Sequence, residues 1–139
     1  GSEGSGLEQA LEHLDRVLKG RAVVCLFSDF IEPVPFRSLA ALSSRHDVVA
    51  VAVSDPAEKQ LPDSGLILLT DQETGATSAL DSSDPSTRQS YRALTEQRRA
   101  ERKRDVSRSG ARYLELGTQS SPIHTLVDFF QGRYRRRCP

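Results

Sequence analysis

The sequence predicts an α/β fold, a partial doubly wound parallel sheet of about three strands with an inserted β-hairpin and flanking helices. Two apolar runs, residues 22–27 and 48–53, have the composition of buried strands, and each is followed by a serine and an aspartate. The helical pattern between them, residues 36–44, has the length of a crossover connection. Such a connection makes the two strands parallel and places their carboxyl ends at one edge of the sheet, where open α/β sheets bind ligands.

Periodicity and turn signals predict the elements on either side of this pair. Leucines at helical spacing indicate a first helix over residues 7–18, and Gly20 supplies its stop. Further along, the apolar run 66–69 and the segment 76–80 are separated by a turn that contains Gly75. This arrangement is typical of a β-hairpin.

The last third of the chain predicts a long helix, a short strand and a closing helix. Asp84 followed by Pro85 is a good helix start, with the acid as N-cap, and the helix runs over residues 86–109. Residues 113–116 form the final strand, and residues 122–132 the closing helix. The long helix has so thin an apolar stripe that we expect it on the protein surface.

Length and composition indicate a small domain with a polar surface. The chain has 139 residues, 37% of them hydrophobic, and a mean hydropathy of −0.46, so by length it is one domain. We expect residues 1–6 to be a linker, 7–132 the folded part and 133–139 a basic tail. No apolar run approaches the roughly 18 residues of a membrane span, and nothing resembles a signal peptide, so a cytoplasmic location is expected.

The two parts of the chain carry opposite charge. Residues 1–87 hold 6 basic and 14 acidic side chains, whereas residues 88–139 hold 13 and 5, so the balances are −8 and +8. This split indicates either pairing within the protein or two partner surfaces of opposite sign, and internal pairing is the simpler interpretation.

The cysteines and histidines do not form a metal-binding or disulfide pattern. Cys25 is expected in the core of its strand and Cys138 in a charged tail, which fits a reducing compartment. His13, His46 and His124 lie far apart in the sequence and are interpreted as ordinary surface or boundary residues. Phosphate-binding glycine loops and the common hydrolase motifs are absent from the sequence, which weighs against those enzyme classes.

Asp29 is the strongest candidate for a functional residue. A carboxylate directly after a buried parallel strand is rigidly aimed and can bind a hard cation such as Mg²⁺, with Ser28, Glu32 and Asp55 as candidate helpers. The spacing equally fits an acid that ends a strand and caps the following turn.

Two other functions remain open from the residues. The basic stretch 98–108 and the arginine-rich tail could bind nucleic acid or an acidic surface, although Tyr91 is the only aromatic residue of that helix. A solvated face that docks an acidic partner is the preferred interpretation of this stretch. A receiver-like phosphotransfer enzyme using Asp29 and Asp55 ranks last, because Lys59 and Lys103 lie in the wrong contexts for such a site.

An ordered series of segments resembles a known family. These segments are residues 23–30, 45–51, 55–58, 61–65 and 71–75. Over about residues 8–134 the chain resembles the C-terminal half of the bacterial domain-of-unknown-function fifty-eight family, von Willebrand factor A-like proteins associated with MoxR-type AAA+ ATPases. The resemblance implies a non-enzymatic protein interaction module that works with such an ATPase in protein assembly or maturation.

The resemblance also implies a metal-ion-dependent adhesion site at the carboxyl edge of the sheet. That site combines an Asp-x-Ser-x-Ser loop, a threonine and an aspartate after the fourth strand, and Asp29 matches the last of these. We expect the strands that carry the other two elements to lie upstream of this chain, which makes it a fragment whose site is incomplete, with Mg²⁺ bound only in the full-length protein, which an upstream segment could anchor to a membrane. Without the neighbouring strand of the longer protein, the strand over residues 22–27 would have an unpaired edge. An unpaired apolar edge can pair with another chain, so a homo-oligomer is expected.

Overall fold

The chain divides into two compact units. The computed structural model describes residues 6–55, 59–71, 74–119 and 121–137, the last five of these in their backbone only. The first unit comprises Gly1–Ser54 and Glu101–Pro139, and the second comprises Asp55–Ala100. None of the helices in the described part of the chain is long and apolar enough to span a membrane.

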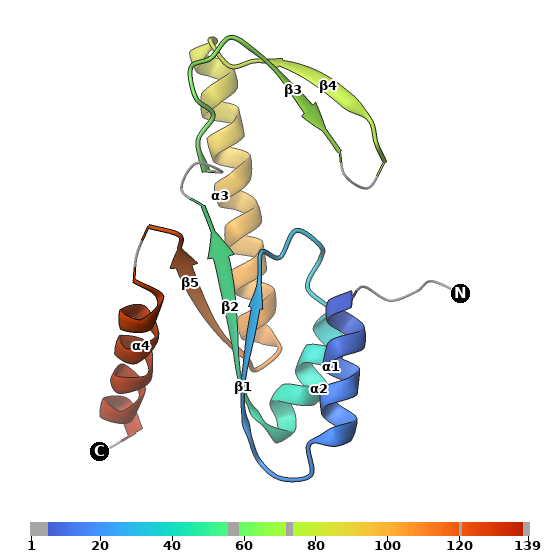
Figure 1. The fold of residues 1–139 in the computed structure, drawn as a ribbon, viewed down its shortest axis with the longest axis vertical. Helices are drawn as coiled ribbons and strands as arrows, with labels where there is room; N and C mark the ends of the chain where they lie inside the picture. The colour runs from blue at the N-terminus through green and yellow to red at the C-terminus, as the bar shows by residue number, and fades with distance from the viewer. Residues whose placement is uncertain (1–5, 56–58, 72–73, 120, 138–139) are drawn as a thin grey trace. The chain divides into compact units, whose positions relative to one another are not determined.

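The first unit contains a parallel three-stranded sheet (Figure 1). Its strands are β1 (Val23–Ser28), β2 (Asp47–Ser54) and β5 (Arg112–Gly117), in the order β1-β2-β5. Both pairings are parallel, with Cys25 beside Val49 and Val51 beside Leu114. The predicted fold class is therefore confirmed, and the carboxyl ends of the three strands share one edge of the sheet.

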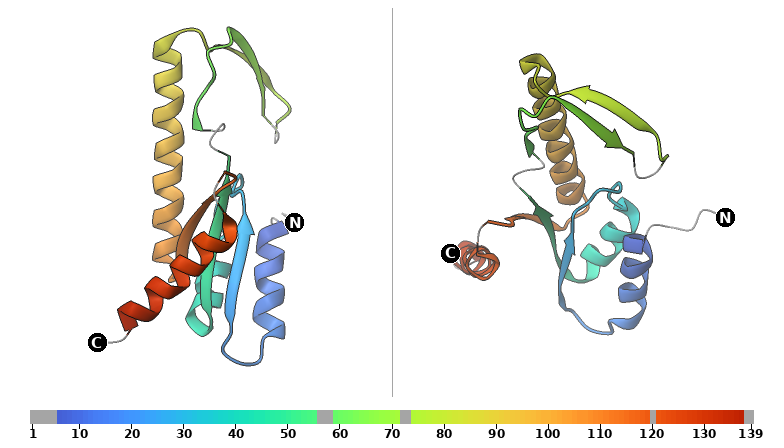
Figure 2. Two further views of the ribbon diagram at one scale, coloured as in Figure 1. Left: turned by 60° about the vertical axis from the view of Figure 1, so that its left-hand side comes forward. Right: turned by 45° about the horizontal axis from the view of Figure 1, so that its top comes forward.

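Helices cover the two faces of this sheet unequally (Figures 1 and 2). The helices α1 (Gly6–Val17) and α2 (Phe36–Arg45), with the end of α3 (Pro85–Arg108), cover one face and bury the larger core cluster. On the other face, α4 (Pro122–Arg137) packs its aromatic residues against β2 and β5. The buried residues of the larger cluster are Leu11, Val24, Leu26, Phe30, Leu39, Leu42, Val48, Ala50, Ala52, Val106 and Ala111.

The prediction that β1 is a buried strand is wrong for one of its faces. Val24 and Leu26 are buried, but Val23 and Phe27 are 57% and 56% exposed, and Cys25 is also exposed rather than in the core. The reason is topological, because β1 ends the sheet and the residues of α4 pack against β2 and β5. The homo-oligomer expected at this edge stays a prediction.

The closing helix is longer than predicted. It continues through Gly132 to Arg137, whereas the sequence predicts a helix that ends near Gly132. A glycine inside a helix costs only about 1 kcal/mol relative to alanine, and arginine is a good helix former. The following arginines therefore extend the helix to Arg137.

The second unit contains the predicted hairpin. Its strands, β3 (Leu66–Thr70) and β4 (Thr77–Asp81), pair antiparallel, with Leu68 opposite Ala79. The connecting turn places Gly75 at a φ of 70°, in the left-handed region that glycine adopts without steric cost. The predicted hairpin and its glycine turn are thus confirmed.

A buried serine joins the base of the hairpin to α3. The hydroxyl of Ser82 donates a hydrogen bond to the carbonyl of Gly65 (2.6 Å) and accepts one from the amide of Ser64 (3.2 Å). The Arg88 guanidinium in turn donates to the Ser82 carbonyl at 2.7 Å. At the start of the helix, Asp84 caps the amide of Ser86 at 3.1 Å, as the sequence indicated.

Candidate functional site

The loop after β1 presents Asp29 to solvent at the carboxyl edge of the sheet. Its side chain is exposed, and Oδ1 accepts a hydrogen bond from the amide of Ile31 at 3.3 Å. The hydroxyl of Ser28 accepts one from the amide of Phe30 at 3.0 Å. Two short polar side chains thus hold the turn, as the local alternative for Asp29 predicted, while the carboxylate faces water.

Phe30 fixes this loop from the core side. It is a non-glycine residue with a φ of 51°, and its side chain is only 5% exposed. A left-handed backbone costs an L-residue about 1–2 kcal/mol, so burial of the ring must offset that cost. The result is a turn whose exposed aspartate is held by a buried neighbour. The sequence carries no sign of this conformation, because left-handed positions usually hold glycine or asparagine.

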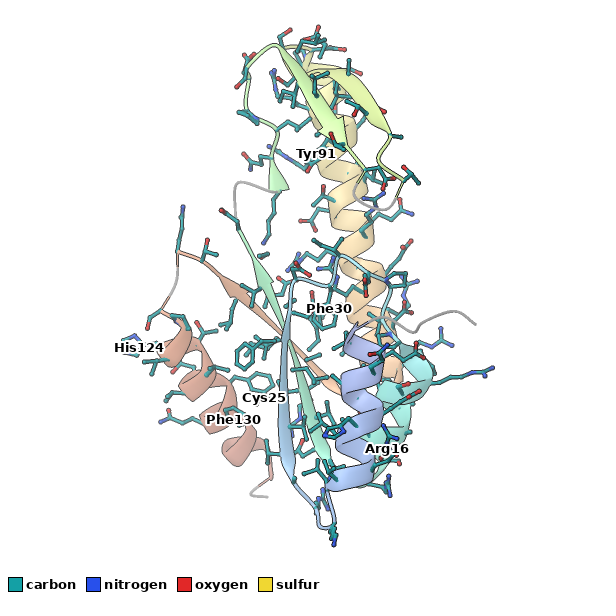
Figure 3. The ribbon with its side chains drawn as sticks, turned by 45° about the vertical axis from the view of Figure 1, so that its right-hand side comes forward. Arg16, Cys25, Phe30, Tyr91, His124 and Phe130 are labelled. Carbon is teal, nitrogen blue, oxygen red and sulfur yellow. The ribbon has the colours of Figure 1, made fainter. Side chains whose placement is uncertain are left out.

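Charged and aromatic residues pack behind the loop within the first unit. The Arg102 guanidinium lies 5.9 Å from the centroid of the Phe30 ring, and Figure 3 shows Phe30 between the end of β1 and α3. On β5, the Tyr113 hydroxyl donates to Glu115 Oε1 at 3.1 Å. Burial, and then the neighbouring Glu115 carboxylate, raise the pKa of Tyr113 above its ordinary value, while Arg102 opposes this rise.

The other polar groups at this edge do not complete a metal site. Ser54 lies beside Gly117 at the ends of β2 and β5, and its carbonyl accepts from the amide of Thr118 at 3.2 Å. Asp55 belongs to the second unit. Within the described part of the chain, no three or more His, Cys, Asp or Glu residues are grouped to hold a metal ion. Mg²⁺ needs several oxygen ligands, so Asp29 as a magnesium ligand stays a prediction.

The histidines lie in different environments. His13 and His124 are exposed, as predicted. Figure 3 labels His124 on α4. His46 is instead buried, and its Nδ1 accepts a hydrogen bond from the amide of Ala22 at 3.2 Å. The prediction of a surface or boundary position is therefore wrong for His46, because the residue closes the turn between α2 and β2 over the start of β1.

The basic stretch of α3 does not present one continuous charged face. Arg99 forms an ion pair with Glu96 at 3.2 Å, and Arg102 packs on Phe30. A helix turns about 100° per residue, so Arg98 and Arg102 share one side of α3, whereas Arg104 and Arg108 share another. This geometry favours separate local roles over the nucleic-acid surface that was considered as an alternative.

The second unit has an open cleft of about 450 Å³ beside the start of α3. Its lining residues are Gln60, Leu61, Asp63, Pro85, Arg88, Gln89 and Arg92. Arg88 is held there by the Ser82 carbonyl and by Asp63, whose carboxylate lies 3.6 Å away. These contacts give Arg88 a structural role at the base of the hairpin, for which the sequence alone carries no signal.

Comparison with known proteins gives a family and several relatives. The family model described as "Protein of unknown function DUF58" matches residues 1–101. An uncharacterized protein of Mycobacterium avium is 34% identical over 130 residues, which cover 93% of this chain and 76% of that protein.

Longer relatives match the chain over the same number of residues. Uncharacterized proteins of Mycobacterium bovis and of Mycobacterium tuberculosis (strain H37Rv) are each 33% identical over 130 residues, and the match spans 41% of each of them. No solved structure matches the chain. The family match and the M. avium relative together show that this chain belongs to the DUF58 family of proteins of unknown function.

Proposed function

We propose that this chain is a non-enzymatic protein–protein interaction module that contacts its partner through the loop after β1. The observation that carries the proposal is the position of Asp29, an exposed carboxylate on a turn that the buried Phe30 ring anchors to the core. Loops at the carboxyl edge of a parallel sheet are the usual ligand-binding part of such folds. A surface carboxylate held on a rigid support is suited to recognising a basic group of another protein.

The hydrogen bonds of the turn support this role. Asp29 Oδ1 accepts the Ile31 amide within the loop, and a carboxylate has further lone pairs to offer a donor from outside. Because the turn is already ordered, a partner that binds it has little backbone freedom to remove, which favours affinity. The described residues do not gather the ligands of a metal around Asp29, so this proposal does not pass through a bound cation.

As the partner we propose a MoxR-type AAA+ ATPase that acts in the assembly or maturation of other proteins. This part rests on the family resemblance, and it assigns the chain a docking role in place of catalysis. The longer mycobacterial relatives extend well beyond the matched 130 residues, so the activity of such a whole protein also depends on parts outside this chain.

The test is a binding titration against the purified MoxR-type ATPase of the same organism, by biolayer interferometry. Asp29→Asn keeps an oxygen that can accept the Ile31 amide but removes the charge. A hydrogen bond to a charged group contributes about 1.5–3 kcal/mol, so the dissociation constant should rise about 10- to 100-fold.

Glu32→Gln is the matched control, because Glu32 is an exposed carboxylate of the same loop and its replacement removes the same charge. We expect Glu32→Gln to bind the ATPase as the unchanged chain does. Equal affinities of the unchanged chain and Asp29→Asn would show that the Asp29 loop is not the contact. No measurable binding of the unchanged chain would remove the ATPase as its partner.

A further inference from the structure

The hairpin of the second unit exposes an apolar face. Leu66 and Leu68 of β3 are 72% and 68% exposed. The register places Leu68 directly opposite Ala79 of β4, and the exposed Ala79 therefore continues the same face. A two-stranded hairpin is marginally stable by itself in water, and three or more strands with an apolar face are usually needed.

The edge of β4 lacks the usual protection against strand pairing. Natural edge strands are blunted by lysine, proline, bulges or a covering element. The strand Thr77–Asp81 contains neither lysine nor proline, and its single charge, Asp81, lies at its end. Among the described residues the hairpin forms a sheet of only two strands, so the outer edge of β4 pairs with no further strand there; Figure 1 shows β4 on the outer side of the hairpin.

We propose that two copies of this chain associate by antiparallel pairing of their β4 strands, which joins the two hairpins into a four-stranded sheet. The strand is its own complement when the two-fold axis passes through Ala79. All five residues of β4 then pair, and Thr77 lies opposite Asp81 of the partner subunit. An axis at Ser78 or at Leu80 would pair only three residues of the strand.

This register gives favourable side-chain pairs across the contact. A threonine hydroxyl can donate to the carboxylate opposite, whereas like charges opposite each other would be destabilising. On the apolar face, Leu68 lies beside Ala79, and Ala79 lies beside Ala79 of the partner subunit. The alanines lie at the axis, so the leucines of both hairpins stand in one row on the same face of the four-stranded sheet.

The mass of the chain in solution tests the association. Sedimentation equilibrium up to about 1 mM detects complexes as weak as a millimolar dissociation constant. We expect a concentration-dependent mass that approaches twice the 15.3 kDa of one chain. Ala79→Lys places two like charges across the axis and should weaken the association at least 10-fold, whereas Ser90→Lys, the same charge change at an exposed position of α3, should not.

Disulfide trapping tests the register. In a background of Cys25→Ser and Cys138→Ser, Ala79→Cys should cross-link under mild oxidation, because directly paired strand residues lie within disulfide reach. Thr77→Cys is the control on the same face, since its two copies would lie about 13 Å apart along the strands. The double variant Thr77→Cys with Asp81→Cys should cross-link again.

A monomer at every concentration, or a dimer that Ala79→Cys does not trap, would overturn the proposal. Cross-linking of Thr77→Cys equal to that of Ala79→Cys would equally overturn it, because the pairing would then lack the predicted register. These measurements contain no ATPase, so their failure is separate from failure of the interaction proposed for the Asp29 loop.

Discussion

Phe30→Gly is expected to be more stable than Phe30→Ala, the reverse of the order at most positions. Both changes remove the ring of a residue that is only 5% exposed, and loss of a buried phenylalanine costs about 3–5 kcal/mol. They differ in the backbone, because alanine keeps the strain of a φ of 51° and glycine does not. Relief of that strain stabilises the glycine variant relative to the alanine variant by about 1–2 kcal/mol. The greater conformational freedom of glycine in the unfolded chain reduces this advantage by about 0.4–1 kcal/mol.

The net expectation is that Phe30→Gly exceeds Phe30→Ala by about 0.5–1 kcal/mol in free energy of unfolding. Urea unfolding, followed by hydrogen exchange of the β2 amides, reports this difference for the first unit. An osmolyte in both samples keeps the destabilised variants folded at zero urea.

Leu39 provides the control, because it is a buried helical residue of the same core. There the glycine variant should be about 1 kcal/mol less stable than the alanine variant. If Phe30→Gly is less stable than Phe30→Ala by the margin seen at Leu39, then the left-handed backbone does not strain this loop and the reasoning is refuted.

Three further outcomes follow from other contacts. Asp47→Asn should lower the free energy of unfolding by about 1.5–3 kcal/mol, because Arg112 donates a hydrogen bond to this largely buried carboxylate at 2.7 Å. Arg45→Gln removes an exposed ion pair and should lower it by less than about 1 kcal/mol. Urea unfolding measures both changes. The pKa of Tyr113 is raised in the folded state, so above about pH 10 the unfolded chain loses this proton more readily than the folded protein does, and stability should fall as the pH rises. Tyr113→Phe should reduce that loss of stability in thermal melts at alkaline pH. Calorimetric titration of Mg²⁺ into this chain should show no binding tighter than about 1 mM, because in the described part of the chain no group of three or more metal-binding side chains includes Asp29. Tight binding that Asp29→Asn removes would contradict this.

The sequence predicted the order of the elements well because their signals are local. Apolar runs bounded by polar residues and helical spacing of leucines each depend on neighbouring residues alone, and the crossover over residues 36–44 then required parallel pairing. Burial depends on which helix covers which strand. The runs at Val23–Ser28 and Asp47–Ser54 have similar composition, yet only the second has a strand on each side and helices over both faces.

At the candidate site, too, local features could be predicted from the sequence and tertiary contacts could not. The position of Asp29 after its strand could be predicted, since a strand that ends in a polar residue places that residue at the sheet edge. The left-handed backbone of Phe30 could not be predicted from the sequence, because its energetic cost is offset by burial of the ring in a core that segments distant in the sequence form. The approach of Arg102 to its ring is likewise a tertiary contact between residues far apart in the sequence.

Hydrogen exchange of this chain with and without the MoxR-type ATPase tests the central claim most directly. We predict that the ATPase slows exchange of the amides of Asp29–Glu32, and that Asp29→Asn abolishes this slowing under the same conditions. An unchanged loop beside slowed exchange elsewhere in the chain would contradict the claim that the Asp29 turn is where this protein meets its partner.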